Sequence, residues 1–249
     1  MKKLMTAAAL AMCASVYAVE SANIVGYNTQ AVNANTWYMI APQFEDVNGT
    51  TTTEIDLLSV MKTEGLVAPT FAQRATASQI QVYDPATSLY NVYYYTSGTG
   101  GTGWRKSPAA PSTLPVKVGS GVWMKVAAAE NASVTIAGQV RAVETTTVNV
   151  GDAGTWQIVS NPYPTALTQG KLTTTGLTAV PFAQRANASQ IQVYDPTTSL
   201  YNVYYYTTGT GGTAWRKSPA APASTDIVCP AGGAFWVKAV NPGTLQFSL

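Results

Sequence analysis

The sequence predicts an all-β protein of two tandem antiparallel β-sandwich or barrel-like repeat units, with at most one short helix. Threonine, valine and tyrosine fill short runs that Gly, Pro and Asn separate, a composition typical of antiparallel β structure. Residues 71–111 also recur as residues 182–222, and the two blocks differ at four of 41 positions. Since a period of about 110 residues is large enough to bury a core, the duplication predicts two domains or half-domains.

The N-terminus has the pattern of a secretory signal peptide. Lys2 and Lys3 precede an apolar run from Leu4 to Val16, which is too short to span a bilayer as a stable helix. The run closes on Val16-Tyr17-Ala18, which predicts cleavage after Ala18 and a signal peptide over residues 1–18. We therefore expect a Sec-exported protein, secreted or at the cell surface, with no transmembrane span after cleavage.

The likeness between the halves extends beyond the duplicated block. A Thr-Trp strand pattern at residue 36 recurs at residue 155, and the Trp-x-Lys pattern of residues 123–125 recurs at residues 236–238. These matches predict a first β unit over residues 19–138, a join over residues 139–152 and a second unit over residues 153–249. They leave open whether the units are separate domains or one fused fold.

The elements of one unit follow from local pattern. Residues 54–62 have apolar spacing near 3.6 and predict the one short helix. Inside the repeat, residues 79–83 and 89–96 alternate polar and apolar as strands do, and Asp84 with Pro85 predicts the turn between them. A glycine-rich tip at residues 98–103 leads into a third strand at Trp104. Residues 122–126 and 134–136 predict two more strands.

Composition excludes several kinds of chemistry. The chain has no histidine, which rules out Ser-His-Asp and Cys-His triads and His-ligated metals. Cleavage removes Lys2 and Lys3 from the 14 basic residues, which leaves 12 against 12 acidic ones. Without a basic cluster we expect no nucleic-acid partner. We likewise expect no cofactor and no metal. Cys229, the one cysteine left, lies in an apolar stretch typical of a buried, inert thiol.

The recurring charged residues predict structural roles. Asp84 and Asp195 are the acids that recur in both units, and each lies in an Asp-Pro turn, where a turn-capping role is expected. We therefore predict that the protein is not an enzyme. A carboxylate hydrolase that uses Glu45 and Asp46 is the weaker alternative. Arg105 and Lys106 are expected to be solvated or to pair with the nearby turn aspartate.

Aromatic residues are the most suggestive set. Three consecutive tyrosines, residues 93–95 and 204–206, must place rings on both faces of a sheet. One face packs the core, and the other meets solvent, another domain or a ligand. The candidate ligand-binding residues are Tyr93, Tyr95, Trp104, Tyr204, Tyr206 and Trp215. Packing or a subunit interface is the competing interpretation of these rings.

The segment Ala22-Asn23-Ile24-Val25-Gly26-Tyr27 and the strand order after it resemble a group of uncharacterised exported β-rich bacterial proteins. Members of that group begin with a similar stretch after the signal peptide. The resemblance covers nearly the whole mature chain through short apolar motifs. It implies secretion and a β fold, and it carries over no functional residue.

These patterns favour a non-enzymatic secreted or cell-surface structural protein that forms homo-oligomers through its Tyr-rich strands. The alternative is a carbohydrate-binding or adhesion module, with a polysaccharide partner and two near-identical aromatic sites. An outer-membrane barrel is disfavoured by short strands and by a C-terminal Leu249 in place of an aromatic residue.

Overall fold

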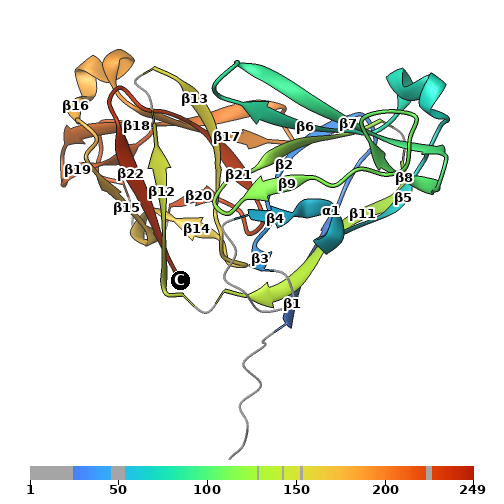
Figure 1. Cartoon of the computed structure of the whole chain (residues 1–249). Coiled ribbons are helices and arrows are strands. Elements are labelled where there is room, and N and C mark those ends of the chain that lie inside the picture. The colour runs from blue at the N-terminus through green and yellow to red at the C-terminus, as the bar shows by residue number, and fades with distance from the viewer. Residues whose placement is uncertain (1–24, 46–53, 128, 142, 152–153, 223–225) are drawn as a thin grey trace, which may run out of the picture.

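The computed structural model describes residues 25–45, 54–127, 129–141, 143–151, 154–222 and 226–249. This part of the protein is all-β, with small, mostly antiparallel sheets arranged in a ring (Figure 1). The predicted signal peptide lies outside the described residues. Within them, no helix has the length and apolar character needed to cross a membrane.

The first half of the chain supplies eleven strands, one helical turn and one 3-10 segment. In order these are β1 (Val25–Ala31), β2 (Thr36–Ile40), β3 (Phe44–Glu45), β4 (Glu54–Asp56), α1 (Leu57–Val60), β5 (Met61–Leu66), η1 (Phe71–Thr76), β6 (Gln79–Asp84), β7 (Leu89–Gly98), β8 (Gly101–Arg105), β9 (Pro115–Lys117), β10 (Val122–Val126) and β11 (Ala129–Val140).

The second half has a closely similar series of elements. In order these are β12 (Thr145–Val150), β13 (Trp156–Ser160), β14 (Leu167–Thr168), η2 (Gln169–Lys171), β15 (Leu172–Thr175), β16 (Val180–Pro181), η3 (Phe182–Asn187), β17 (Gln190–Asp195), β18 (Leu200–Gly209), β19 (Gly212–Arg216), β20 (Ile227–Cys229), β21 (Ala234–Lys238) and β22 (Gly243–Ser248).

The strand pairings of the two halves correspond. A main sheet runs β2-β10-β6-β7-β8 in the first half and β13-β21-β17-β18-β19 in the second. A second sheet centres on β11, between β1 and β5, or on β22, between β12 and β15. The pairs β4-β9 and β14-β20 complete the match. The halves differ in that β3 adds to β11. The parallel pairing of β16 with β18 has a counterpart in the first half, a single parallel bridge between Thr70 and Ser97 of β7.

The meander predicted inside the duplicated block is present. Strands β6, β7 and β8 pair antiparallel in that order. The glycine-rich tip is shorter than predicted, because β8 already begins at Gly101, opposite Gly98. Only Thr99 and Gly100 connect the strands, and Gly100 and Gly101 have φ angles of 80° and 95°. Such backbone favours glycine, which explains the glycine-rich tip in both halves.

The predicted helix over residues 54–62 is largely wrong. Only Leu57–Val60 is helical, while residues 54–56 and 61–66 are strands β4 and β5. Asp56 ends β4 and caps the turn, because its Oδ1 accepts hydrogen bonds from the backbone N–H groups of Leu58 and Leu114. Pairing of β4 with β9 and of β5 with β11 therefore overrides a weak helical pattern.

The predicted join over residues 139–152 contains the end of one strand and the whole of another. Residues up to Val140 belong to β11, and residues 145–150 form β12. Strand β12 pairs along its whole length with β22 near the C-terminus. The segment between the halves is therefore short, and most of the predicted join is sheet.

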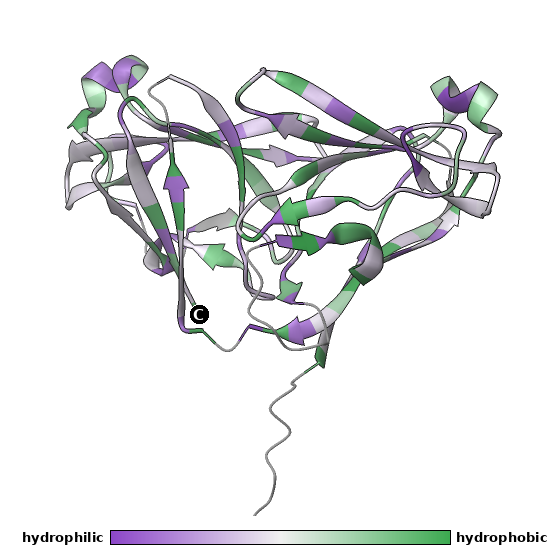
Figure 2. Cartoon of the chain, in the orientation of Figure 1, coloured by the Kyte–Doolittle hydropathy of each residue, from purple (hydrophilic) through white to green (hydrophobic). Residues whose placement is uncertain are grey.

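Each half buries its own hydrophobic cluster. Side chains of the main sheet, such as Ile80 and Met124, pack in one cluster with Val134 and Ile136 of β11. In the second half, Ile191 and Val237 pack likewise with Leu245 and Phe247 of β22. Figure 2 shows the hydrophobic and hydrophilic residues interleaved along the strands, as expected for sheets with one buried face.

A pocket of aromatic side chains between the two halves

The six aromatic residues predicted to bind a ligand lie in the hydrophobic cores. Tyr93 and Tyr204 are 5% exposed, and Trp104 and Trp215 are 6% and 1% exposed. Tyr95 and Tyr206 are partly buried and pack against the same two clusters. Four of the six rings are therefore buried, while Tyr204 lines one surface pocket and Tyr206 and Trp215 line another. Ligand binding by these residues stays a prediction.

Strand register explains why these rings are buried. Tyr95 lies opposite Trp104, and Tyr206 lies opposite Trp215, so each pair shares one face of its sheet. That face is the one covered by β11 or β22, and the paired rings are 5.2 and 5.1 Å apart. Trp215 also donates a hydrogen bond from Nε1 to Thr174 Oγ1 of the covering sheet.

The opposite face of each main sheet, which we call the outer face, carries a second set of aromatic rings. Opposed residues across the strands form one row in each half, and the rows match in composition. The first row contains Trp37, Lys125, Gln79 and Tyr94; the second contains Trp156, Lys238, Gln190 and Tyr205. All eight side chains are partly exposed.

A neighbouring row on the outer face is also repeated. Trp123 lies opposite Gln81, and Trp236 lies opposite Gln192. Tyr83 pairs with Tyr90 and Tyr194 pairs with Tyr201 at the ends of the strands. Tyr90 and Tyr201 are each 42% exposed.

The two outer faces meet where the halves join, and the contacts there are reciprocal. The Tyr83 ring lies 4.9 Å from that of Trp236, and the Tyr194 ring lies 5.0 Å from that of Trp123, both edge to face. Ala41 N–H donates to Gly232 O, and Ser160 N–H donates to Gly119 O. The β6-β7 hairpin therefore contacts the second half, and the β17-β18 hairpin contacts the first half, as the ends of β6 and β17 show in Figure 1.

A pocket of about 330 Å³ opens between the halves at this contact; we call it the junction pocket. Six of its seven lining residues are aromatic. The lining is Trp37, Gln81, Tyr90, Trp123, Tyr194, Tyr201 and Trp236. Both halves contribute, so the pocket exists only because the two main sheets adjoin.

Polar groups of the outer face surround these rings. Gln81 Nε2 donates to Gln79 Oε1, and Gln192 Nε2 donates to Gln190 Oε1, which fixes two amide pairs on the outer face. The indole N–H of Trp236 donates a hydrogen bond to the Tyr201 hydroxyl. The remaining amide donors and acceptors are available to hydroxyl groups of a ligand.

Tyr90 and Tyr201, two tyrosines of the junction pocket, are neutral at ordinary pH. Burial raises the pKa of Tyr90, and the nearby hydroxyls of Tyr201 and Tyr83 raise it further. Burial also raises the pKa of Tyr201, although the hydrogen bond from Trp236 acts in the opposite direction. Both phenols therefore present hydrogen-bonding hydroxyls rather than negative charges.

The recurring carboxylates have structural roles. Asp84 Oδ1 accepts from the Ala86 N–H, and Asp195 Oδ1 accepts from the Thr197 N–H, both at 2.9 Å. The turn-capping role predicted for these acids is therefore confirmed, and the bonds to Thr197 and Thr198 lower the pKa of Asp195. The described residues contain no cluster of three metal-ligating side chains.

The structure also places Cys229, Arg105 and Glu45, for which the sequence predicts roles. Cys229 is buried, and burial raises the pKa of its thiol, which confirms the prediction of an inert cysteine. The prediction for Arg105 is wrong, because its guanidinium is fully buried and donates to the carbonyls of Thr99, Gly101 and Ala109. Arg216 does the same in the second half. Glu45 forms a buried ion pair with Arg141 at 2.9 Å, whereas Asp46 lies outside the described residues.

Sequence reasoning missed the junction pocket because its residues come from five separate stretches of the chain. One local signal was present: a Trp followed two residues later by a Lys occurs at the same place in both halves. Comparison with protein-family models, with curated proteins and with solved structures finds no match to this chain.

Proposed function

We propose that this chain is a non-enzymatic exported protein that binds a polysaccharide in the junction pocket. The observation that carries the proposal is the lining of the pocket, in which six Trp and Tyr rings, of which only Trp123 is buried, adjoin the Gln81 amide. The apolar face of a sugar ring stacks on aromatic rings, and amides and phenols exchange hydrogen bonds with its hydroxyls. Export is inferred from the N-terminal pattern at Lys2, Lys3 and Ala18.

We further propose that each half, from β1 to β11 and from β12 to β22, is one β-sandwich unit and that the two units are fused at the junction pocket. The corresponding strand pairings and the two separate hydrophobic clusters support this division. On this proposal the duplication provides two matching walls of one pocket instead of two separate sites.

Two observations argue against self-association through the Tyr-rich strands, which the sequence alone favours. Strand β7 pairs with β6 and β8, and β18 pairs with β17 and β19, so both edges of each strand are occupied. Tyr93 and Tyr204 are buried in the core. An assembly of copies would therefore need another surface, and light scattering during size-exclusion chromatography would detect it.

Binding to plant, algal and microbial polysaccharides tests the proposal. In the double variant Tyr90→Ala/Tyr201→Ala we expect affinity for the best-bound glycan to fall by about tenfold or more, because two pocket rings are lost. Pull-down on insoluble glycans and calorimetry with soluble fragments would measure it.

The matched control is Leu89→Ala/Leu200→Ala. Each leucine directly precedes one of the two tyrosines, is 67% exposed and does not line the junction pocket. We expect this variant to bind like the original protein. Absence of binding to the whole panel, or equal binding by the tyrosine variant, would contradict the proposed function.

A further inference from the structure

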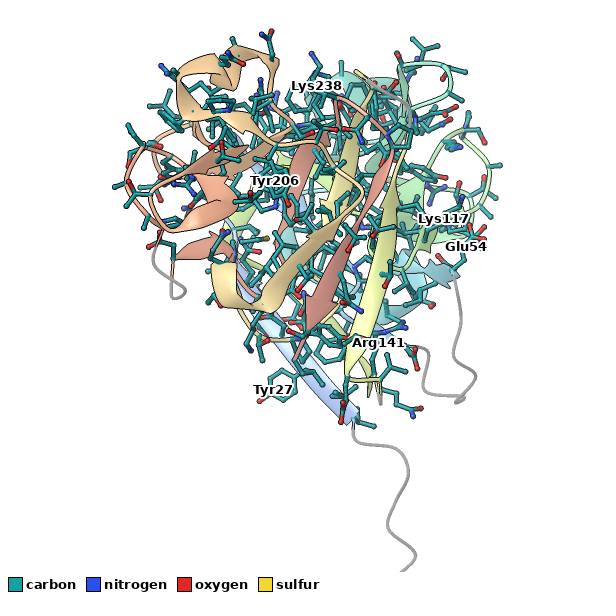
Figure 3. All side chains as sticks on the ribbon, turned by 90° about the vertical axis from the view of Figure 1, so that its left-hand side faces the viewer. Tyr27, Glu54, Lys117, Arg141, Tyr206 and Lys238 are labelled. Atoms are coloured by element: carbon teal, nitrogen blue, oxygen red, sulfur yellow. The ribbon has the colours of Figure 1, made fainter. Side chains whose placement is uncertain are left out.

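Two lysines occupy equivalent positions beside the junction pocket. Lys125 Nζ lies 5.7 Å from the ring centroid of Trp37, which lines the pocket. Lys238 Nζ lies 5.9 Å from the ring centroid of Trp156, and that ring lies 6.1 Å from the ring of Trp236, which lines the pocket. Both are partly exposed on the outer face. Figure 3 shows Lys238 at one end of the molecule, opposite the end with Tyr27 and Arg141.

Neither lysine has a carboxylate partner among the described residues. Glu45 forms its ion pair with Arg141 and not with either lysine. In register, Lys125 lies between Trp37 and Gln79, and Lys238 lies between Trp156 and Gln190. None of the outer-face rows contains Asp or Glu.

An exposed cation gains only a weak attraction from an aromatic ring, so the ring contact alone does not explain a lysine at both positions. Charged residues are scarce in this protein, at 10% of the chain, yet an unpaired cation occurs at the same place in both halves. The pair gives the outer face a positive charge that no described acid of its rows offsets. An anionic ligand would be complementary to it.

We propose that the ligand is an acidic polysaccharide, whose anionic groups pair with Lys125 and Lys238 while its sugar rings stack in the junction pocket. This inference rests on the proposed function and names its ligand class. The anionic group is a carboxylate or a sulfate ester on the sugar. Since equivalent lysines belong to the two halves, one chain that crosses the pocket would contact both.

The experiment compares three probes by calorimetry: oligogalacturonate, which carries carboxylates, dextran sulfate, and neutral cello-oligosaccharides. We expect at least one acidic probe to bind more tightly than the neutral one, with an affinity that falls as salt is raised. In Lys125→Gln/Lys238→Gln we expect about a tenfold or greater loss for the acidic probe and loss of most of its salt dependence.

The matched control is Lys62→Gln/Lys117→Gln, which removes two exposed lysines of β5 and β9. These lie off the outer face, and Lys117 is well separated from Lys238 in Figure 3. We expect this variant to bind the acidic probe like the original protein. An equal loss in both variants would mean attraction by net charge alone and would overturn the inference.

Failure of the inference is distinguishable from failure of the proposed function. Equal or tighter binding of a neutral glycan, lost in Tyr90→Ala/Tyr201→Ala and kept in Lys125→Gln/Lys238→Gln, would retain the proposed function and overturn the acidic ligand. Binding of the acidic probe that survives the lysine substitutions would overturn it as well. Preference between carboxylate and sulfate probes would identify the anionic group.

Discussion

Arg105 and Arg216 show at the scale of the residue how a strand position can hold a buried charge. Each follows a core tryptophan, and each guanidinium donates to carbonyls at the tip of the adjoining hairpin and in the loop that follows its strand. A buried guanidinium is tolerated because these carbonyls replace water as acceptors. Sequence could not predict this, since an Arg next to a Lys usually marks a solvated strand end.

Replacing this side chain should destabilise the fold. In Arg105→Met the apolar stem remains but three backbone carbonyls lose their donors, and we expect the free energy of unfolding to fall by about 2–3 kcal/mol. Urea denaturation followed by circular dichroism measures the change. Arg74→Met is the control, because Arg74 is exposed and lies over Phe71; its loss should stay below about 1 kcal/mol. Equal effects of the two substitutions would contradict the assigned role.

At the scale of the element, the turn chemistry was predictable and the helix was not. The Asp84 and Asp195 turns depend on bonds within four residues, which local sequence contains. Strand β4 depends on β9, which lies about sixty residues further along the chain, so a local apolar spacing misidentified it. Contacts between the halves depend on even more distant residues, as the approach of Gly121 to Ala234 shows.

Gly121, which directly precedes β10, and Ala234, the first residue of β21, occupy equivalent positions and meet at the junction between the halves. A methyl group on Gly121 would collide with the Ala234 methyl group and press on Ile158. We expect Gly121→Ala to lower the free energy of unfolding by about 1–3 kcal/mol, as overpacking does. The exchange variant Gly121→Ala/Ala234→Gly removes the methyl collision and should recover part of that loss.

The same denaturation measurement, made on both variants and on Ala234→Gly alone, checks this prediction. Since the two residues share one space, their effects should be far from additive. Additive losses would show that the close approach of the halves does not decide stability. A gain in glycan binding by Gly121→Ala would likewise contradict the view that the junction is closely packed.

At the scale of the whole molecule, the fold joins two similar halves through aromatic side chains and gives them one shared pocket. The buried or partly buried phenols of this arrangement link its stability to pH. Burial raises the pKa of Tyr90, Tyr201, Tyr204 and Tyr206 above the ordinary value of 10.0. A phenol with a raised pKa in the folded state favours the fold while it is neutral.

Stability should therefore be constant with respect to these groups below pH 10 and should fall as the pH rises through their folded-state pKa values. Tyrosinate absorbance and circular dichroism during an alkaline titration measure ionisation and unfolding together. Between neutral and alkaline pH, Tyr201→Phe should lose less folding stability than the original protein does. Tyr27→Phe, at a site 76% exposed, is the control and should leave the profile unchanged. If Tyr201→Phe leaves the dependence of stability on pH unchanged, the proposed link between tyrosine ionisation and stability is contradicted.

The sequence by itself determined the all-β class, the meander in each half, the turn-capping aspartates and the inert character of Cys229, because these depend on short-range pattern and composition. Only the tertiary structure decided which face of the Tyr-rich strands is buried. Alternation places Tyr93 and Tyr94 on opposite faces, but both faces carry aromatic rings, so the pattern is the same whichever one is covered. Strands β11 and β22 cover the face that holds Trp104 and Trp215, and the other face then meets its counterpart across the junction.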